Sequence, residues 1–489
     1  MVKSMKFYSI AIGILFVMST FARAENSLAP PEVETLSNGL KIAWFLNDRI
    51  PVVDVGILVQ AGYRDDAVGK SGTAELIGEL LDRGAGGMSA QELSASIESV
   101  GGSHYCSTSD DSFNVGVHGL TSDAKLLLDV LAKMVLHPDF PENEVNRGRV
   151  RLIDRWNHFE DYSDAIVNLT YQKMVTAGTS YGRGNMISEN ELKGVMRSDI
   201  VNYYKTYFVP QNAILTVVGK VDKEVFRQWV TVEFGNWKSS AISASLERSE
   251  SPGTVAIGRP RVRSNYTWKN LNRKGSNPAI IIVNRPNLAQ AQIRMGSPSL
   301  SIHAPEHYAL RVANSILGEL FNSRLNSSIR DKLGLSYAIN SSFTFYQSFA
   351  DLAVSTGTQN ETVGPLIRKV LEVLKDFREN PTSAPITSKE VEAAKEYLIG
   401  GFALANSSLN AVAGRWIIGE FFNLGPDYLN AFVPKIRQVT LKDVGDAVAK
   451  AYDPAQIVVV IAGNPELIQK SLSSVGLTSI KQVSASDLK

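Results

Sequence analysis

Two histidines and a glutamate occur at metal-binding spacing in His303-Ala304-Pro305-Glu306-His307, which fits the pattern H-x-x-E-H letter for letter. In that pattern two histidines one helical turn apart bind zinc, and the glutamate activates a water molecule. The pattern requires one continuous helix. Because proline fits best in the first turn of a helix, Pro305 leaves His303 outside the helix that contains His307. We therefore expect both histidines to be surface residues at a helix start, without a bound metal.

A pair of carboxylates lies in the segment Lys70-Ser71-Gly72-Thr73-Ala74-Glu75-Leu76-Ile77-Gly78-Glu79-Leu80-Leu81. Glu75 and Glu79 are four residues apart, so on a helix they share one face, opposite the apolar residues. That face could contribute to a site for a hard cation, or it could be a solvated acidic surface. Two carboxylates alone are too few ligands for a metal ion, so the sequence favours the solvated surface.

An arginine and a tyrosine with strong hydrogen-bond donors occur in Ile329-Arg330-Asp331-Lys332-Leu333-Gly334-Leu335-Ser336-Tyr337. Guanidinium and phenol groups can donate to a carbonyl oxygen as it gains negative charge. Structural roles fit these residues equally well. Arg330 would be a cation favoured in the last turn of a helix, and Tyr337 would pack in a strand.

The elements that would hold this pair follow from the local pattern. We predict a long amphipathic helix that starts near Pro305 and ends with Gly334 as its C-terminal cap. An extended segment should run from Tyr337 through Phe345.

The segment around Glu75 resembles the zinc helix of the M16 peptidase family, the pitrilysin-like or inverzincin zinc peptidases that include mitochondrial processing peptidase. The family pattern at this point is G-x-A-H-x-x-E-H. Glu75 stands at the first histidine, Gly78 at the catalytic glutamate and Glu79 at the second histidine. The last zinc ligand of the family is a glutamate that precedes a turn similar to Glu160-Asp161, and it falls at Arg155.

These substitutions oppose a zinc site in this chain. The positive charge of Arg155 repels a metal ion, and Gly78 has no side chain that could take a proton from water. We expect no metal, no other cofactor and no catalytic residue of this chain's own.

The segment that ends at Tyr337 resembles the family's R-x-x-x-G-L-x-Y. In active members this arginine and tyrosine lie across the cleft from the zinc, bind the substrate backbone and help to stabilise the tetrahedral intermediate. The resemblance implies that Arg330 and Tyr337 do so for a zinc site in a partner subunit.

The sequence repeats itself in two halves. A predicted helix from Arg197 to Tyr207 and a strand from Ala213 to Val218 are matched by a helix from Leu441 to Tyr452 and a strand from Ile457 to Ala462. Strands mixed with amphipathic helices indicate an α+β fold. The resemblance implies two homologous M16-type domains, similar to LuxS and mitochondrial processing peptidase, in a clam-shell arrangement. The predicted boundaries are 1–24 for a signal peptide, 25–240 for the first domain, 241–277 for a linker and 278–489 for the second domain.

The N-terminus has the layout of a signal peptide. Lys3 and Lys6 precede an apolar run from Phe7 to Val17, and Ala22-Arg23-Ala24 has the small-x-small pattern of a cleavage site. No later stretch approaches the roughly 20 apolar residues of a membrane-spanning helix. We predict export to the periplasm or a comparable compartment, without membrane insertion.

Composition names no partner by itself. The 50 Lys and Arg nearly cancel the 49 Asp and Glu, so no overall field attracts nucleic acid. Cys106 is the single cysteine and cannot form an internal disulfide.

Three functions are compatible with these observations. The first is a non-catalytic, substrate-binding subunit of a zinc peptidase heterodimer, whose partner carries H-x-x-E-H and zinc and whose substrate is an unfolded peptide. The second is a peptide-binding or scaffold protein without a proteolytic role. The third is an autonomous zinc metallopeptidase that uses His303 and His307.

Overall fold

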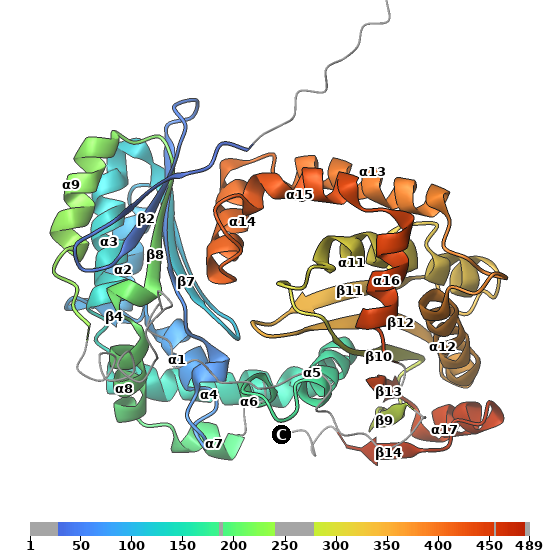
Figure 1. Ribbon diagram of the computed structural model, residues 1–489. Helices are drawn as coiled ribbons and strands as arrows, with labels where there is room; N and C mark the ends of the chain where they lie inside the picture. Colours follow the sequence, from blue (N-terminus) through green and yellow to red (C-terminus); the bar gives the residue numbers. More distant parts are fainter. Residues whose placement is uncertain (1–27, 185–188, 240–277, 454–455, 485–489) are drawn as a thin grey trace, which may run out of the picture.

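The computed structural model describes residues 28–184, 189–239, 278–453 and 456–484, and Figure 1 shows two halves side by side. The predicted signal peptide, 1–24, and the predicted linker, 241–277, lie outside the described residues.

The first half is a mixed sheet with helices packed on one face. Within the described residues the strand order is β1-β2-β8-β3-β7-β6, and all neighbours are antiparallel except the parallel pair β2 and β8. The strands are β1 (Glu32–Thr35), β2 (Lys41–Leu46), β3 (Val52–Val59), β6 (Ser103–Thr108), β7 (Phe113–Leu120) and β8 (Ala213–Gly219). The helices of its core are α1 (Thr73–Leu80), α2 (Ala90–Glu98), α3 (Ala124–Leu136), α4 (Glu142–His158), α7 (Glu189–Gly194), α8 (Arg197–Tyr207) and α9 (Lys223–Phe234).

The second half has the same design. Its strand order among the described residues is β11-β12-β10-β13-β9-β14. The strands are β9 (Ala279–Asn284), β10 (Gln290–Ser299), β11 (Ile339–Phe345), β12 (Ala350–Gln359), β13 (Val458–Gly463) and β14 (Ile480–Val483). The helices of its core are α11 (His307–Asn314), α12 (Val363–Glu379), α13 (Ser388–Ala405), α15 (Tyr428–Gln438), α16 (Leu441–Ala451) and α17 (Pro465–Ser474).

The predicted repeat is confirmed by the topology. In each half a late strand inserts beside the first long strand and parallel to it, as β8 does with β2 and β13 with β9. The helix before each late strand is also equivalent, α8 in one half and α16 in the other. The edge strands differ in origin, because β1 precedes its sheet in the sequence whereas β14 follows α17. The chain thus forms two homologous α+β domains.

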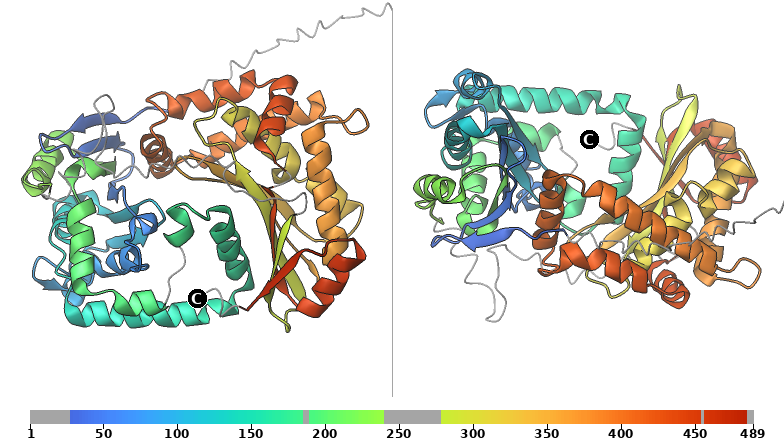
Figure 2. Two further views of the ribbon diagram at one scale, coloured as in Figure 1. Left: turned by 60° about the horizontal axis from the view of Figure 1, so that its bottom comes forward. Right: turned by 90° about the horizontal axis from the view of Figure 1, so that it is seen from above.

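Each half sends a helix to the sheet of the other half. Helix α5 (Ser163–Val175) packs Ile166, Val167 and Tyr171 against the second sheet, in a cluster with buried residues of β9, β12 and β13. Helix α14 (Leu409–Phe421) packs against Phe45 and other buried residues of β2 and β8. Figures 1 and 2 show α14 beside the first sheet, and the segment from α4 through α5 spanning to the second half.

The two halves face each other as the clam-shell arrangement requires, and polar contacts accompany the exchanged helices (Figure 1). Lys41 of β2 forms an ion pair with Glu420 of α14. Arg294 of β10 donates to Asn168 of α5 at 3.0 Å. The closing movement that the family resemblance implies stays a prediction.

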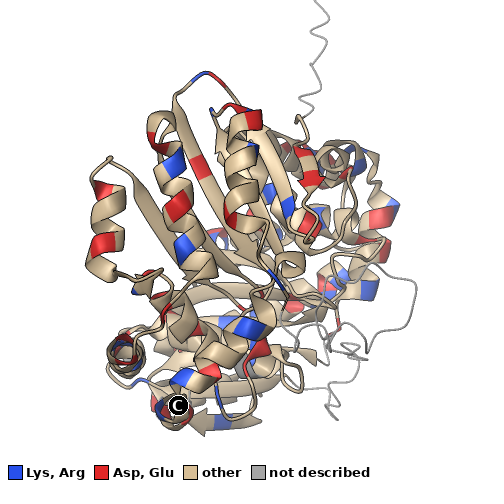
Figure 3. Cartoon of the chain, turned by 90° about the vertical axis from the view of Figure 1, so that its left-hand side faces the viewer, with Lys and Arg blue, Asp and Glu red and all other residues tan. Residues whose placement is uncertain are grey.

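The surface carries both charge signs. Figure 3 colours acidic and basic residues along the chain, and both occur on the same helices of the first half, in keeping with the near-equal counts of the two signs. In the part of the chain that the structure describes, no helix is both long and apolar enough to span a bilayer.

Substitution of Trp416 tests the packing of α14 against the first sheet. It is 7% exposed, and its ring centroid lies 5.9 Å from that of Phe45 in an edge-to-face contact between the halves. We expect Trp416→Ala to lower the free energy of unfolding by about 3–5 kcal/mol, because a large buried ring is lost and a cavity remains. Chemical denaturation followed by circular dichroism measures the change. The half-exposed Ile418 of the same helix is the control, and Ile418→Ala should cost less than about 1 kcal/mol. Equal effects would contradict this packing.

Candidate functional site

Helix α1 presents two opposite faces. Its start is fixed by Asp66, whose carboxylate accepts hydrogen bonds from the backbone N–H of Gly72 at 2.8 Å and of Ala74 at 2.9 Å. Gly72 has a left-handed backbone, φ +90°, which favours glycine. The apolar face of α1 is buried in the core of the first half, as its pattern predicts. Glu75 and Glu79 therefore point away from the core, toward α4.

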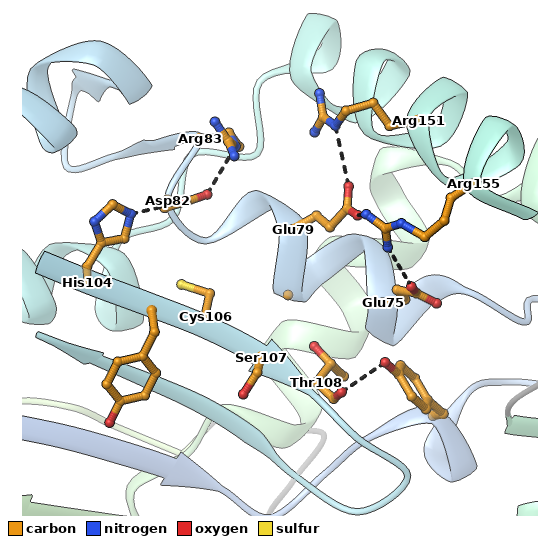
Figure 4. Close-up of a pocket in the computed structure, with 13 residues that line it drawn as sticks. Glu75, Glu79, Asp82, Arg83, His104, Cys106, Ser107, Thr108, Arg151 and Arg155 are labelled. Atoms are coloured by element: carbon orange, nitrogen blue, oxygen red, sulfur yellow. Dashed lines mark hydrogen bonds and ion pairs between the residues drawn. The ribbon is translucent and has the colours of Figure 1, made fainter. Parts of the chain in front are cut away.

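Arg155 of α4 lies between these two carboxylates (Figure 4). Its Nη1 is 3.0 Å from Oε1 of Glu75, and its Nη2 is 2.5 Å from Oε1 of Glu79. Arg151, one turn earlier on α4, places its Nε 3.5 Å from Oε2 of Glu79. The structure thus brings together three of the positions predicted from the family resemblance. The prediction of a solvated acidic face is wrong, because arginines of α4 neutralise it.

The electrostatics of this cluster follow from its partial burial. Burial raises the pKa of Glu75 above its usual range, and the attraction of Arg155 offsets this effect only in part. Burial lowers the pKa of Arg155, but its two carboxylate partners outweigh burial and raise that pKa overall. The guanidinium is therefore always charged and already supplies the cation that the two carboxylates require.

Gly78 lies where strand β6 approaches α1 most closely. A Cβ atom built on Gly78 would lie 1.9 Å from Oγ1 of Thr108, well inside van der Waals contact. The backbone of Thr108 is held by the Tyr63 side chain, whose hydroxyl donates a hydrogen bond to the Thr108 carbonyl at 2.9 Å. A glutamate at position 78 would thus need the Thr108 side chain to rotate away and its Cβ, 3.2 Å from the built atom, to give way slightly. The position that corresponds to the family's catalytic glutamate therefore has no carboxylate, and the Thr108 side chain lies in the space that one would enter.

A pocket of about 510 Å³ surrounds this cluster. It lies between α1, α4 and β6, the edge strand of the first sheet. An edge strand presents unpaired backbone groups to which an extended peptide can add. The lining residues are Tyr63, Glu75, Gly78, Glu79, Asp82, Arg83, His104, Tyr105, Cys106, Ser107, Thr108, Arg151 and Arg155 (Figure 4).

The donor set of this pocket does not fit zinc. His104 is its single histidine, and its Nε2 lies 3.1 Å from Asp82. Across the described ranges, no group of three or more His, Cys, Asp or Glu side chains could hold a metal ion. The carboxylates of Glu75 and Glu79 already have the guanidinium of Arg155 between them.

The histidines of the literal H-x-x-E-H do not share a helix. Helix α11 begins at His307, two residues after Pro305, and His303 lies before it. His303 is exposed, but the prediction that His307 is a surface residue is wrong. His307 is 8% exposed, and its ring lies 5.3 Å from that of Phe345. Burial, together with Arg311 and His303, lowers the pKa of His307 to about 4.

Arg330 and Tyr337 lie in the second half. The predicted continuous helix is wrong: α11 ends at Asn314, π-helical turns cover Ser315–Glu319 and Asn326–Asp331, and a tight turn separates them. Gly334 has the predicted left-handed backbone, φ +59°, and its N–H donates to the carbonyl of Arg330 at 3.1 Å.

Tyr337 does not pack in a strand. It precedes β11, which begins at Ile339, and it is 95% exposed. Arg330, in contrast, is held by several contacts, including a hydrogen bond from its Nε to Asp331 at 2.8 Å. The structural role considered for Tyr337 is therefore wrong, and its hydroxyl is available to a ligand.

Thr108 and Arg151 belong to the site but were not found by sequence reasoning. Arg151 had a usable signal, because it lies one helical turn before Arg155 on the same face. Thr108 had none, since it is 30 residues beyond Gly78 and only the sheet topology brings it to α1.

Comparison with known proteins agrees with this architecture. Residues 43–185 match the family model described as insulinase (peptidase family M16), and residues 195–398 match the model described as peptidase M16 inactive domain. The chain belongs to the M16 peptidase family.

The alignments with two relatives cover most of this chain and most of each relative. A Bacillus subtilis protein named uncharacterized zinc protease YmxG is 25% identical over 381 residues, which cover 78% of this chain and 86% of that protein. The mitochondrial-processing peptidase subunit beta of Lentinula edodes is 22% identical over 438 residues, 87% of this chain and 89% of that one.

Solved structures share the fold. A peptidase M16 inactive domain from Pseudomonas fluorescens has a TM-score of 0.74 at 19% identity, covering 89% of this chain and 98% of that chain. The periplasmic protease PqqL from Escherichia coli has a TM-score of 0.68 at 15% identity, covering 89% of this chain and 46% of that one.

The cluster around Arg155 makes a prediction about zinc. After exhaustive dialysis the unchanged chain should retain much less than one equivalent, whereas the triple variant Glu75→His, Glu79→His, Arg155→Glu should bind about one zinc per chain. The variant should still not cleave peptides, because Gly78 supplies no base. Elemental mass spectrometry and a fluorogenic peptide assay measure the two properties. One tightly held zinc in the unchanged chain would refute the prediction.

A further substitution tests whether a side chain at position 78 fits beside Thr108. Adding Gly78→Glu to the triple variant should lower its melting temperature, because the new side chain meets Thr108. Thr108→Gly in the same background is the control and should recover part of the loss.

Proposed function

We propose that this chain is the non-catalytic, substrate-binding subunit of an exported M16-type zinc metallopeptidase heterodimer that degrades or processes peptides. A partner subunit with H-x-x-E-H binds the zinc, and this chain supplies Arg330 and Tyr337 to the partner's site. The observation that carries the proposal is a contrast. At the degenerate zinc helix Arg155 occupies the space between Glu75 and Glu79, while Tyr337 is almost fully exposed.

The chemistry of the pair suits this role. A guanidinium and a phenol hydroxyl can both donate to a carbonyl oxygen that becomes negatively charged when water attacks the peptide bond. Among the described residues Tyr337 has no partner that would explain it as a packing residue, since it is 95% exposed. The name of the Lentinula edodes relative, a beta subunit of a processing peptidase, is consistent with action in an assembly.

Two observations support an exported compartment. The layout of residues 1–24 is that of a signal peptide, and a structural neighbour from Escherichia coli is named a periplasmic protease. We place the chain in the periplasm or an equivalent exported compartment, where it would meet unfolded peptides. The near-neutral net charge of +1 gives no reason to expect nucleic acid as a ligand.

Substitution of the pair tests the proposal. In the assembled heterodimer we expect Arg330→Ala and Tyr337→Phe each to lower kcat/KM for peptide cleavage by about 10²–10³-fold, the usual cost of a lost donor to a developing oxyanion. Peptidase assays after co-purification of the pair from the exporting cell measure this. Tyr397→Phe, an exposed tyrosine of α13, is the matched control and should be silent. Unchanged cleavage by the double variant Arg330→Ala, Tyr337→Phe would end the proposal.

A peptide-binding or scaffold role without proteolysis is the second candidate. It is favoured by the pocket of about 510 Å³ beside the edge strand β6, which could hold a peptide without any zinc. Stable peptide binding by the isolated chain, with no peptidase recovered in pull-downs, would select it. An autonomous peptidase that uses His303 and His307 lacks support, because the helix starts at His307 and this side chain is buried.

A further inference from the structure

A tight turn next to Arg330 carries a large exposed aromatic side chain. Phe321 is 80% exposed, and the guanidinium carbon of Arg330 lies 4.1 Å from the centroid of its ring. The backbone carbonyl of the same residue accepts a hydrogen bond from Nη2 of Arg330 at 3.2 Å. Cation–π contacts are effective within about 6 Å, so this pair is at close range.

The turn is tied to the helical segment that carries Arg330. Asn326 donates from Nδ2 to the carbonyl of Leu320 at 3.3 Å, and Ser327 donates from Oγ to the carbonyl of Asn322 at 3.3 Å. The N–H of Ser323 closes the turn on the carbonyl of Leu320 at 2.9 Å. The position of the Phe321 backbone is therefore set by the same short segment, Asn326–Asp331, from which Arg330 projects.

These contacts fix the guanidinium on three sides. The ring lies against one face, the Phe321 carbonyl binds Nη2, and Asp331 binds Nε at 2.8 Å. Two of the five N–H donors are used by these hydrogen bonds of the described residues, which leaves three for a ligand. The side chain of Arg330 is only 21% exposed as a result.

We infer that Phe321 is a positioning residue for Arg330. Its ring holds the guanidinium in one plane and directs the remaining N–H donors toward the substrate carbonyl. The Arg330 side chain is therefore already ordered before the peptide binds, and binding loses less conformational entropy. Because the Phe321 ring is 80% exposed, packing in the hydrophobic core does not account for it. What Arg330 then binds rests on the proposed function, whereas the positioning itself is a property of this chain alone.

The positioning can be observed by NMR in the full chain labelled with 15N-arginine. The Nε–H proton of Arg330, identified by its loss in Arg330→Ala, should be shifted upfield by the ring current of Phe321. Phe321→Leu should remove the upfield shift while the hydrogen bond from Nε to Asp331 remains, and Phe321→Tyr should retain the shift. An Arg330 resonance that is the same in Phe321→Leu as in the unchanged chain would overturn the inference.

Cleavage by the assembled pair gives the second measurement. Phe321→Leu should lower kcat/KM by about threefold or more, Phe321→Tyr should stay within about twofold, and Leu404→Ala, an exposed leucine of α13, should change nothing. If Arg330→Ala has no effect on cleavage, the proposed function fails while the NMR result still decides the positioning. If Phe321→Leu impairs cleavage without moving the Arg330 resonance, the ring contacts substrate or partner instead, and the inference fails.

Discussion

The exchange of α5 and α14 between the halves is the packing on which the rest of the structure depends. Each helix completes an apolar cluster on a sheet to which it does not belong in sequence. The fit is close, since a Cβ atom at Gly296 of β10 would lie 2.5 Å from the Tyr171 hydroxyl of α5 and 2.1 Å from the Leu352 carbonyl. Two apolar clusters that span the halves resist a hinge within one chain.

At the altered zinc helix, side chains of opposite charge occupy positions that correspond to the metal ligands of the family. Glu75 and Glu79 bring two negative charges to α1, and Arg155 and Arg151 bring two positive charges from α4. The zinc ligands of this family fall on the same two helices, and in this chain ion pairs join them. Gly78 stands at the position of the family's catalytic glutamate and has no side chain that could take a proton from water. The close contact of Gly78 with Thr108 also shows that α1 and β6 pack tightly at this point.

Much of this arrangement could be predicted from the sequence, and the errors have physical causes. The strands Ala213–Gly219 and Val458–Gly463 were found within one residue because each is a short β-branched run after a proline turn. The meeting of Glu75, Glu79 and Arg155 came from the family pattern. Burial of His307 was missed, since an apolar environment made by Phe345 comes from a strand 38 residues away.

The remaining misses concern long-range packing. The interrupted helix between Asn314 and Asp331 was read as continuous because its apolar spacing hides the change in hydrogen bonding. The exchange of α5 and α14 left no local signal either. An apolar helix face has the same pattern whichever sheet it covers, so periodicity cannot say which half it joins.

The two candidate sites differ in what the fold requires of them. The arginine and glutamate side chains between α1 and α4 are partly buried and neutralise each other. Substitution of one leaves a charge without its partner, so it would change the stability of the fold together with any activity. Tyr337 has almost no contact area to lose, and removal of its hydroxyl costs the fold nothing. Arg330 contacts a turn on the surface instead of the core. A loss of activity after substitution in this second group can therefore be assigned to binding or catalysis instead of unfolding, which makes it the sharper place to test what the chain does.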